Sequence, residues 1–400
     1  MFYQIYCRAF QKMFYAGSPF LPWRQPELLQ GKNSMLELPL LLKQKKLSHP
    51  LIVTDKGVMQ SSILTPLLEA LKNSGIAFTI YDETVPNPTI ENIEQVKKLY
   101  EAYCCDAIIA AGGGSPIDCA KGAAARIARP QTSIPAMRGV LRIRTQLPPF
   151  FAVPTTAGTG SEVTVACVVT DSSTHEKYAL MDPSLIPHYA VLDPLLTVTM
   201  PPSVTAATGM DALTHAVEAY IGRSNTAETR AAARKAVKLV LTNLEDVYHN
   251  GEDIEKRAAM QEAAYAGGVA FTRAFIGNVH AIAHNLGGLY GYPHGLANAV
   301  LLPCVLRQYG TVINERLAEL ADLIPLTART ASHAEKAEAF ISRIEKMNKK
   351  MNIPETIDVL KEKDFPVITQ RALKEANPLY PVPKIFSEID MYEILQKIRK

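Results

Sequence analysis

One aspartate and four histidines stand in the chain at spacings that suit a metal ion. Asp211 and His215 are four residues apart in TGMDALTHAVEAY, His280 and His284 repeat that interval, and His294 follows after a glycine-rich bend. On a helix, residues i and i+4 lie on one face, about one turn apart. A single buried histidine is usually satisfied by its neighbours, but five such groups on two apolar, alanine-rich helices would each need a partner. The pattern therefore predicts a two-helix metal site.

The identity of the metal stays open at this point. Nitrogen and carboxylate donors without cysteine suit zinc or iron(II), and ligand type alone does not choose between them. Spacing also does not say which of His280, His284 and His294 are ligands. A metal-stabilised binding or scaffold protein without catalytic activity is the non-enzymatic alternative.

A glycine loop earlier in the chain has the residues of a phosphate-binding site. AGGGSPIDCAK (111–121) follows an apolar stretch and opens a predicted helix. Gly113 and Gly114 let the backbone approach a ligand, and the free N–H groups of a helix start attract an anion. Ser115 can donate a further hydrogen bond to a phosphate. Asp118 is expected in the first turn, either near the ligand or as a simple cap of the helix.

A second polar loop, VPTTAGTGSEVT (153–164), is rich in hydroxyl groups. A tight turn would not need so many adjacent donors, whereas a diphosphate, a ribose or a carboxamide would use them. Two such loops in one domain predict a dinucleotide pocket, which a scaffold protein would not require. The hydroxyl residues of the loop are Thr155, Thr156, Thr159, Ser161 and Thr164.

Asp55 ends the apolar run LIVTD, at the edge of a sheet where folds of this class bind ligands. An acid at that place accepts hydrogen bonds from the hydroxyls of the adenosine ribose and repels a 2′-phosphate. The residue therefore favours NAD over NADP. Its alternative role is that of an ordinary turn residue before Lys56 and Gly57.

Two types of sequence pattern, in the two halves of the chain, indicate which elements carry these residues. Up to about residue 195, short apolar runs alternate with helical stretches, which predicts a parallel, Rossmann-like sheet covered on both faces. After MPPSV (200–204), amphipathic helical stretches rich in alanine, leucine, glutamate and lysine take over. The predicted strands are 51–55, 78–82, 106–115, 150–156, 163–171 and 189–193, and the predicted helices of the first half are 61–75 and 90–103.

The fold class is thus an α/β dinucleotide-binding domain followed by an all-α metal-binding domain. We expect the first domain over 1–197 and the helical metal-binding and substrate domain over 198–400, because 400 residues exceed one ordinary core. The first twenty residues alternate apolar and polar side chains, which favours a strand or hairpin attached to the first domain.

Composition narrows the choice of partners. The formal net charge is only +3 and the basic residues are scattered, so nothing indicates a nucleic-acid surface. No uninterrupted apolar run reaches the length of a membrane span, and the first residues lack the features of a signal peptide. The six cysteines show no paired spacing, which favours free thiols and a cytoplasmic location.

Taken together, the motifs resemble the iron-containing (group III) alcohol dehydrogenases. VPNPT, GGGSPID, VPTTAGTGSEVT, TGMDALTHAVEAY and HAIAHNLGGLYGYPHGLAN occur in the order and at the intervals of that family, from about residue 50 to 310. No single one of these motifs is specific, but their combination is.

The resemblance implies a role for each matching position. Asp211, His215, His280 and His294 resemble the four metal ligands, and His284 resembles an additional histidine near the nicotinamide that relays a proton. Gly113, Gly114, Ser115 and Asp118 resemble the pyrophosphate loop. Thr155, Thr156, Thr159, Thr164 and Lys177 resemble contacts to ribose and nicotinamide, Asn87 resembles an adenosine-side contact, and Asp55 occupies the position that discriminates NAD from NADP.

The implied activity is the NAD- and iron-dependent interconversion of a small primary alcohol and its aldehyde, by a homodimer or higher homo-oligomer. NADP as cofactor, and zinc or another divalent metal, remain alternatives. A zinc-dependent polyol dehydrogenase of the glycerol type is disfavoured by GYPHGLAN and the full Asp/His set. A lyase of the dehydroquinate-synthase type is disfavoured because 205–221 and 278–298 contain no lysine or arginine.

One segment departs from the family pattern besides the first thirty residues. IPAMRGVLRIRTQLPP (134–149) replaces a shorter, more acidic connection, and its Arg138, Arg142 and Arg144 are expected on the surface or in a subunit contact.

Overall fold

The computed structural model describes residues 2–174 and 176–400, which form two compact units. The first, which we call the α/β unit, comprises Pro22–Met200 and Gly251–Gln261. The second, the helical unit, comprises the segment up to Leu21, Pro201–Asn250 and Glu262–Lys400. An α/β unit with a parallel sheet and a mostly helical remainder confirm the predicted fold class.

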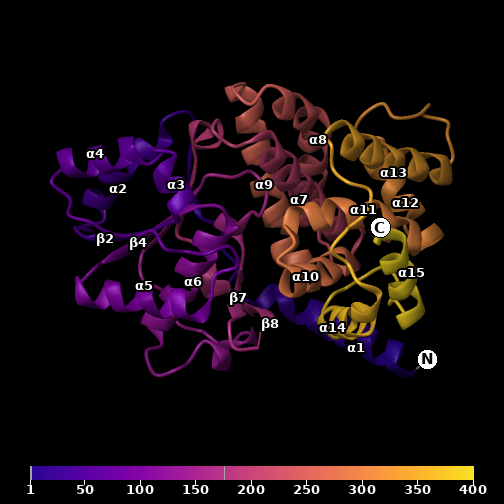
Figure 1. Ribbon diagram of the computed structural model, residues 1–400, viewed down its shortest axis with the longest axis horizontal. Helices are drawn as coiled ribbons and strands as arrows, with labels where there is room; N and C mark the ends of the chain where they lie inside the picture. The colour runs from indigo at the N-terminus through magenta and orange to yellow at the C-terminus, as the bar shows by residue number, and fades with distance from the viewer. Residues whose placement is uncertain (1, 175) are drawn as a thin grey trace. The chain divides into compact units, whose positions relative to one another are not determined.

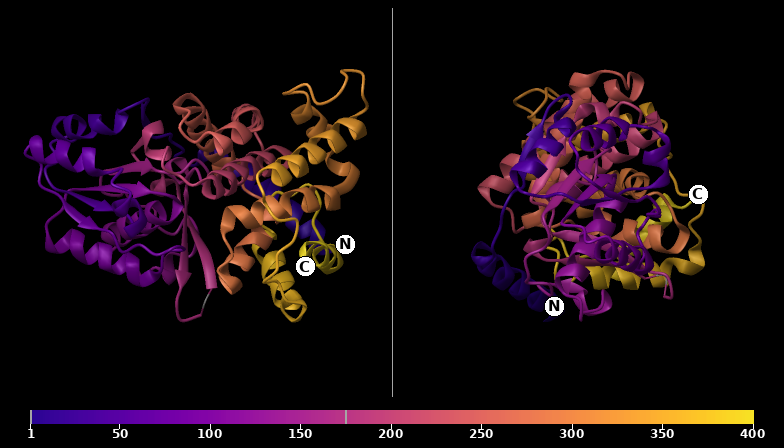
Figure 2. Two further views of the ribbon diagram at one scale, coloured as in Figure 1. Left: turned by 45° about the horizontal axis from the view of Figure 1, so that its top comes forward. Right: turned by 90° about the vertical axis from the view of Figure 1, so that its left-hand side faces the viewer.

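The α/β unit is built on six parallel strands (Figures 1 and 2). Every residue of the four central strands is buried, as expected for apolar strands covered on both faces. Five of the six strands were predicted, and β1 was not. In spatial order the strands are β1 (Glu27–Gln30), β9 (Tyr189–Leu192), β6 (Phe150–Pro154), β4 (Ala107–Gly112), β2 (Pro50–Val53) and β3 (Thr79–Tyr81).

Alternate residues of the strands serve two separate cores. Ile108 of β4 packs in the cluster that includes α5 (Ile90–Ala102) and α6 (Gly114–Ala128). Its neighbour Ile109 packs in the opposite cluster, with α2 (Leu38–Gln44) and α4 (Thr65–Asn73). Figure 1 shows these two helical layers on either side of the sheet. Because successive side chains of a strand point to opposite faces, each apolar run contributes to both cores.

The order of the strands creates the place for a ligand. After β2 the chain adds β3 on one side and then returns to place β4 on the other side of β2. Ligands of such sheets bind beyond the carboxyl ends of the strands where the order reverses. Asp55 follows β2, Gly113 follows β4 and Thr155 follows β6, so the predicted cofactor residues begin at the carboxyl ends of three adjacent strands.

A small second sheet corrects one sequence prediction. The run 163–171 was expected to continue the parallel sheet, but β7 (Ala166–Asp171) pairs antiparallel with β8 (Glu176–Met181), which was not predicted. The burial of β7 alternates along the strand, as in a hairpin covered on one face only. The third strand is β5 (Gly139–Val140), from the unusual segment 134–149.

The segment 134–149 is fixed to this small sheet. The Asp182 carboxylate accepts the backbone N–H groups of Ile143 and Arg144, and Arg138 forms a two-pronged ion pair with Glu176. Arg142 and Arg144 are exposed, as expected.

The helical unit has α7 (Pro202–Ile221) at its centre. From Gly209 to Ile221 every residue of α7 is buried; most of these residues are small or apolar, and the polar ones among them include Asp211, His215 and Glu218. The stretch His294–Ala321 is long and apolar enough to cross a membrane, but most of its apolar part is buried inside the structure, as in the core helix of a globular protein. The other long helices of this half of the chain are α8 (Ala227–His249), α9 (Ile254–Ala274, which starts in the α/β unit), α10 (Asn278–Tyr290), α11 (His294–Tyr309), α12 (Asn314–Ala321), α13 (His333–Lys350), α14 (Phe365–Ala376) and α15 (Glu388–Ile398).

The N-terminus corrects a second prediction. A strand or hairpin on the first domain was expected, but the chain begins with the helix α1 (Phe2–Gly17). Its residues Cys7 and Gln11 are buried at a spacing of one helical turn, and Gln11 and Arg8 bind backbone carbonyls of the helical unit. Periods of two and 3.6 both fit this short, aromatic-rich sequence, and the tertiary contacts decide in favour of the helix.

Candidate functional site

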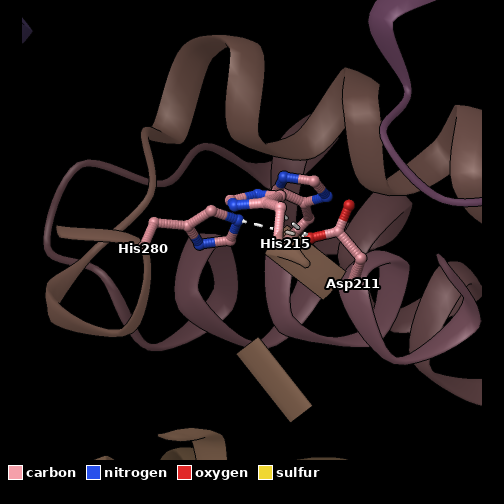
Figure 3. Close-up of side chains that lie close together, drawn as sticks. Asp211, His215 and His280 are labelled. Atoms are coloured by element: carbon pink, nitrogen blue, oxygen red, sulfur yellow. Dashed lines mark ion pairs between the residues drawn. The ribbon is translucent and has the colours of Figure 1, made fainter. Parts of the chain in front are cut away.

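Four side chains converge inside the helical unit. α7 supplies Asp211 and His215, α10 supplies His280, and His294 is the first residue of α11. One ligand atom from each of the four residues lies within 4.8 Å of all the others. Figure 3 shows His215 and His280 turned toward the Asp211 carboxylate. The i, i+4 spacing on α7 places the first two on one face, and the helix contacts bring the others to them.

The charges of this cluster match a cation site. Burial alone would raise the pKa of Asp211, but the neighbouring His215, His294 and His280 hold it well below its ordinary value. Burial opposes the charged form of His280, yet the nearby carboxylates of Asp211 and Glu218 raise its pKa to about 9. The His215 ring lies between Phe271, at 4.2 Å between ring centroids, and His280, at 4.4 Å. Positive charge is therefore stabilised at the Asp211 carboxylate.

Glu218 orients one of the histidines. This buried carboxylate lies two turns along α7 from Asp211 and accepts the Nδ1–H of His280 at 2.6 Å. It also accepts the backbone N–H groups of Gly277 at 2.9 Å and Val279 at 2.7 Å. With Nδ1 engaged, Nε2 of His280 faces the Asp211 carboxylate at 3.7 Å. A carboxylate behind a histidine in this way fixes its tautomer and its direction as a ligand.

Asn298 closes the cluster from α11. Its fully buried amide donates from Nδ2 to Asp211 Oδ1 at 2.7 Å, and lies 3.1 Å from Nε2 of His280 and 3.2 Å from Nε2 of His294. One side chain therefore spans three of the four candidate ligands. All three contacts come from one amide nitrogen, whose two N–H groups can serve two of these atoms at a time.

A glycine allows α7 and α11 to meet here. A Cβ atom at Gly295 would lie 2.3 Å from the carbonyl oxygen of Ala207 and 3.4 Å from Cβ of Asp211. No side chain fits at that distance, so the close approach of the two helices requires glycine directly after His294.

His284 lies beside the cluster, on the same face of α10 as His280. Its ring stacks on His294 with 5.2 Å between centroids. Nδ1 of His284 donates to Oε1 of Glu375 at 2.6 Å, and the hydroxyl of Tyr380 donates to the same oxygen at 2.9 Å. This histidine is therefore bonded to a carboxylate outside the four-residue cluster.

In the α/β unit, three predicted cofactor residues contact one another. The backbone N–H of Asn87 donates to Oγ of Ser115 at 3.2 Å, and Nζ of Lys177 donates to Oδ1 of Asn87 at 2.8 Å. Asn87 adopts a left-handed φ of 58°, which asparagine tolerates better than most residues. Since the Ser115 oxygen accepts from Asn87, its own O–H remains able to donate to a ligand.

The two loops fit against each other through glycine. A Cβ atom at Gly114 would lie 2.9 Å from Cγ2 of Thr159, and one at Gly113 would lie 3.4 Å from Cγ2 of Thr156. The backbone N–H of Thr155 donates to the carbonyl of Gly112 at 3.0 Å. The glycine loop and the hydroxyl loop thus form one surface at the start of α6, whose first turn carries no acidic residue.

Asp118 and Thr164 take part in a buried network. α6 begins at Gly114, so Asp118 lies one turn further in than expected and accepts Oγ–H of Ser161 and N–H of Val168. Lys121, fully buried, donates to the carbonyl and hydroxyl oxygens of Thr164 at 2.8 and 3.0 Å. Burial lowers the pKa of Lys121 to about 8, although Asp118 acts in the opposite direction. These contacts fix the hydroxyl loop to α6.

Asp55 caps the short helix α3 (Lys56–Gln60). Its Oδ1 accepts the backbone N–H of Val58 at 2.9 Å, so the residue has the role of an N-cap. The capping bond uses one carboxylate oxygen and orients the side chain.

Sequence reasoning missed the residues that support the histidines. Glu218 has a recognisable position, seven residues after Asp211 on an apolar helix, and Asn298 follows His294 at i+4. Glu375 and Tyr380 have no local signal, because they are about 90 residues from His284 and meet it only in the fold.

Comparison with known proteins agrees with this geometry. The family model of iron-containing alcohol dehydrogenase matches residues 25–194, and the C-terminal model of the same family matches residues 205–399. The chain is 40% identical to 1,3-propanediol dehydrogenase of Klebsiella pneumoniae over 332 residues, 82% of this chain and 85% of that protein. It is 35% identical to the NAD-dependent methanol dehydrogenase of Bacillus methanolicus, over 89% of this chain and 93% of that protein.

A solved structure shares the whole architecture. The crystal structure of a 1,3-propanediol oxidoreductase superposes with a TM-score of 0.90 at 35% identity, covering 94% of this chain and 99% of the other. With both family models matched in order and relatives named as dehydrogenases of alcohols and diols, the chain belongs to the iron-containing alcohol dehydrogenase family and is an oxidoreductase acting on CH–OH groups.

Proposed function

We propose that the protein is an NAD-dependent, iron-dependent dehydrogenase that interconverts a small primary alcohol and its aldehyde. The observation that carries the proposal is the buried group of Asp211, His215, His280 and His294, whose ligand atoms lie within 4.8 Å of one another. Relatives named for 1,3-propanediol and methanol support a short alcohol or diol as substrate.

The four residues fit a divalent metal. One carboxylate and three neutral imidazoles would leave a net charge of +1 with such an ion, which suits an anionic alkoxide. Oxygen and nitrogen donors without sulfur fit Fe²⁺, and they fit Zn²⁺ as well. When bound, the metal supplies Lewis-acid polarisation of the substrate oxygen. The low pKa of Asp211 keeps its carboxylate ionised as a ligand at any physiological pH.

The proposed proton acceptor is Nε2 of His284. Because Nδ1 of this ring donates to Glu375, the neutral form has its lone pair at Nε2. We propose that this atom receives the proton that leaves the alcohol hydroxyl, directly or through water. Hydride leaves the carbinol carbon in the same reaction, and the nicotinamide supplies the acceptor.

The α/β unit would hold the dinucleotide. Gly113, Gly114 and Ser115 at the start of α6 present backbone N–H groups and a hydroxyl suited to a diphosphate. Asp118 and Thr164 contribute through the network with Ser161 and Lys121. The other proposed contacts are four loop residues and one residue of β8: Asn87, Thr155, Thr156, Thr159 and Lys177.

Asp55 is proposed to select NAD over NADP. A carboxylate held by its capping bond at the end of β2 would accept hydrogen bonds from the ribose and repel a 2′-phosphate. The preference is also consistent with the relative that is named as NAD-dependent.

The test is a panel of alcohols and aldehydes with NAD and with NADP, run without oxygen on protein of measured metal content. We expect alcohol-dependent formation of NADH by iron-loaded protein, with lower activity for NADP. The absence of such activity with both iron and zinc would refute the proposal. We also propose that the protein is cytoplasmic, which six free cysteines favour. We further propose that it is a homodimer or higher homo-oligomer, which light scattering would test.

A further inference from the structure

We propose that the N-terminal helix α1 positions the proton-accepting histidine His284 through the segment 377–383 and Glu375. The segment 377–383 links α14 to the last part of the chain, and α1 holds it by side-chain hydrogen bonds. The proposal rests on the proposed catalytic role of His284.

The first link is the shared oxygen of Glu375. Oε1 accepts Nδ1–H of His284 at 2.6 Å and the hydroxyl of Tyr380 at 2.9 Å. A carboxylate with two donors on one oxygen is restrained in rotation as well as in position. The ring of His284 is thereby held with its Nε2 directed away from Glu375, which is the arrangement that a proton acceptor needs.

The second link is the position of Tyr380. Its side chain is buried, with 6% of its surface exposed, and its hydroxyl has the Glu375 carboxylate as its partner. The residue belongs to a segment outside regular secondary structure, so its placement depends on what binds the backbone of that segment.

The third link is α1 itself. Nε2 of Gln11 donates to the carbonyl oxygens of Tyr380 at 2.8 Å and Pro378 at 3.1 Å. Arg8 donates to the carbonyl oxygens of Val382 at 2.7 Å and Pro383 at 3.0 Å. Two side chains of one helix thus satisfy four carbonyl groups of the segment that carries Tyr380.

Arg8 and Gln11 act as one unit. Nη1 of Arg8 also donates to Oε1 of Gln11 at 2.8 Å, so the arginine orients the amide that binds the segment. Gln11 is buried, with 8% of its surface exposed, which protects its bonds from competition by water. Glu375 lies at the end of α14, two residues before the segment that α1 binds.

α1 lies outside the matched part of the family. The family model begins at residue 25, whereas Arg8 and Gln11 precede it. The helix that holds the segment 377–383 therefore lies outside the part of the chain that the family model describes. The hydrogen bonds of Arg8 and Gln11 described above end on each other and on the segment 377–383, so we expect α1 to affect turnover and not metal binding.

The test is a double-mutant cycle with Gln11→Met and His284→Ala. Methionine keeps the length of glutamine and removes both donated bonds, and Lys12→Met, at the neighbouring exposed position, is the matched control. We expect Gln11→Met to lower kcat about 10-fold, because small displacements of a catalytic group are costly. Bound metal and KM for NAD should stay unchanged, and the control should have wild-type kcat.

The decisive comparison is made in the His284→Ala background. If α1 acts through His284, Gln11→Met causes no further loss there. An equal loss in both backgrounds, or no loss in the wild-type background, overturns the link between α1 and His284. If His284→Ala itself leaves kcat unchanged, the proposed role of His284 fails, and the present proposal fails with it.

Tyr380→Phe provides a milder variant should Gln11→Met not fold. It removes only the hydroxyl that restrains Glu375, so we expect a loss in kcat of about 3-fold. The solvent deuterium isotope effect on kcat should rise, because proton transfer to a mispositioned His284 becomes slower. An unchanged isotope effect together with unchanged kcat would contradict the role of Glu375 and Tyr380.

Discussion

Glu218 offers a sharp test of how the metal centre is built. Its two carboxylate oxygens accept three donors, the Nδ1–H of His280 and the backbone N–H groups of Gly277 and Val279. Glu218→Gln keeps the shape of the side chain and replaces one acceptor oxygen by an N–H₂ group. Since both oxygens face donors, either orientation of the amide sets an N–H₂ group against an N–H group inside the core.

The magnitude follows from these contacts. A buried donor left without an acceptor costs about 1–3 kcal/mol, and the loss of a carboxylate behind a ligating histidine lowers metal affinity by about 10–100-fold. The N–H···O bond to His280 is short, at 2.6 Å, and the site is buried, so we expect the upper part of that range. The glutamine side chain also lacks the negative charge that attracts a cation to this cluster.

The assay is competition for iron or zinc between the protein and a chelator of known affinity. The thermal midpoint of metal-free and metal-loaded protein should be recorded beside it. Glu262→Gln is the matched control, because Glu262 forms its ion pair with Lys235 on the surface. Unchanged metal affinity in Glu218→Gln would refute the orienting role, even if the protein were less stable. Equal weakening in both variants would also refute it.

Four further outcomes are expected. Asp211→Ala should abolish metal binding, measured by elemental analysis, because it removes the carboxylate common to the cluster. Gly114→Ala should raise KM for NAD about 10-fold with little loss of stability, because its Cβ would displace Thr159, 2.9 Å away; an unchanged KM would exclude this loop from the cofactor site. Asp55→Ser should improve kcat/KM for NADP relative to NAD, and an unchanged ratio would remove Asp55 from cofactor selection. Burial raises the pKa of Glu162 from 4.5 to about 7, so between these pH values the folded state holds a proton that the unfolded state has lost. The free energy of unfolding should therefore fall as the pH rises from about 4.5 to 7. Thermal midpoints measured across this range should show the fall in the wild type and a flatter curve in Glu162→Gln.

The strands of the α/β unit could be predicted from the sequence where continuous apolar character was the only strong signal. Strands such as 150–154 and 189–192 are apolar throughout because helices cover both faces, and that pattern has no competing interpretation at this length. β7 is different. Its alternating burial was visible only as a mixed apolar run, so it was assigned to the parallel sheet and not to a hairpin with β8.

The candidate site, too, was predictable only where it depends on residues close together in the sequence. Spacing on one helix brought Asp211 to His215 and His280 to His284, because the helical repeat is a local property. The approach of α7, α10 and α11 to one another is not local, so spacing left the choice among the histidines open. The partners of His284 were hidden for the same reason: Glu375 and Tyr380 reach it from a distant part of the chain.

The glycine after His294 limits how this centre can change. Because a Cβ atom at Gly295 would meet the Ala207 carbonyl at 2.3 Å, the separation of α7 and α11 is at its minimum, and any larger residue must drive the helices apart. Such a shift would carry His294 away from Asp211, since each is fixed to its own helix. Variation in metal preference must therefore arise from exchange of the ligands or their hydrogen-bond partners, and redesign of the centre is best confined to those side chains while the helix crossing is left intact.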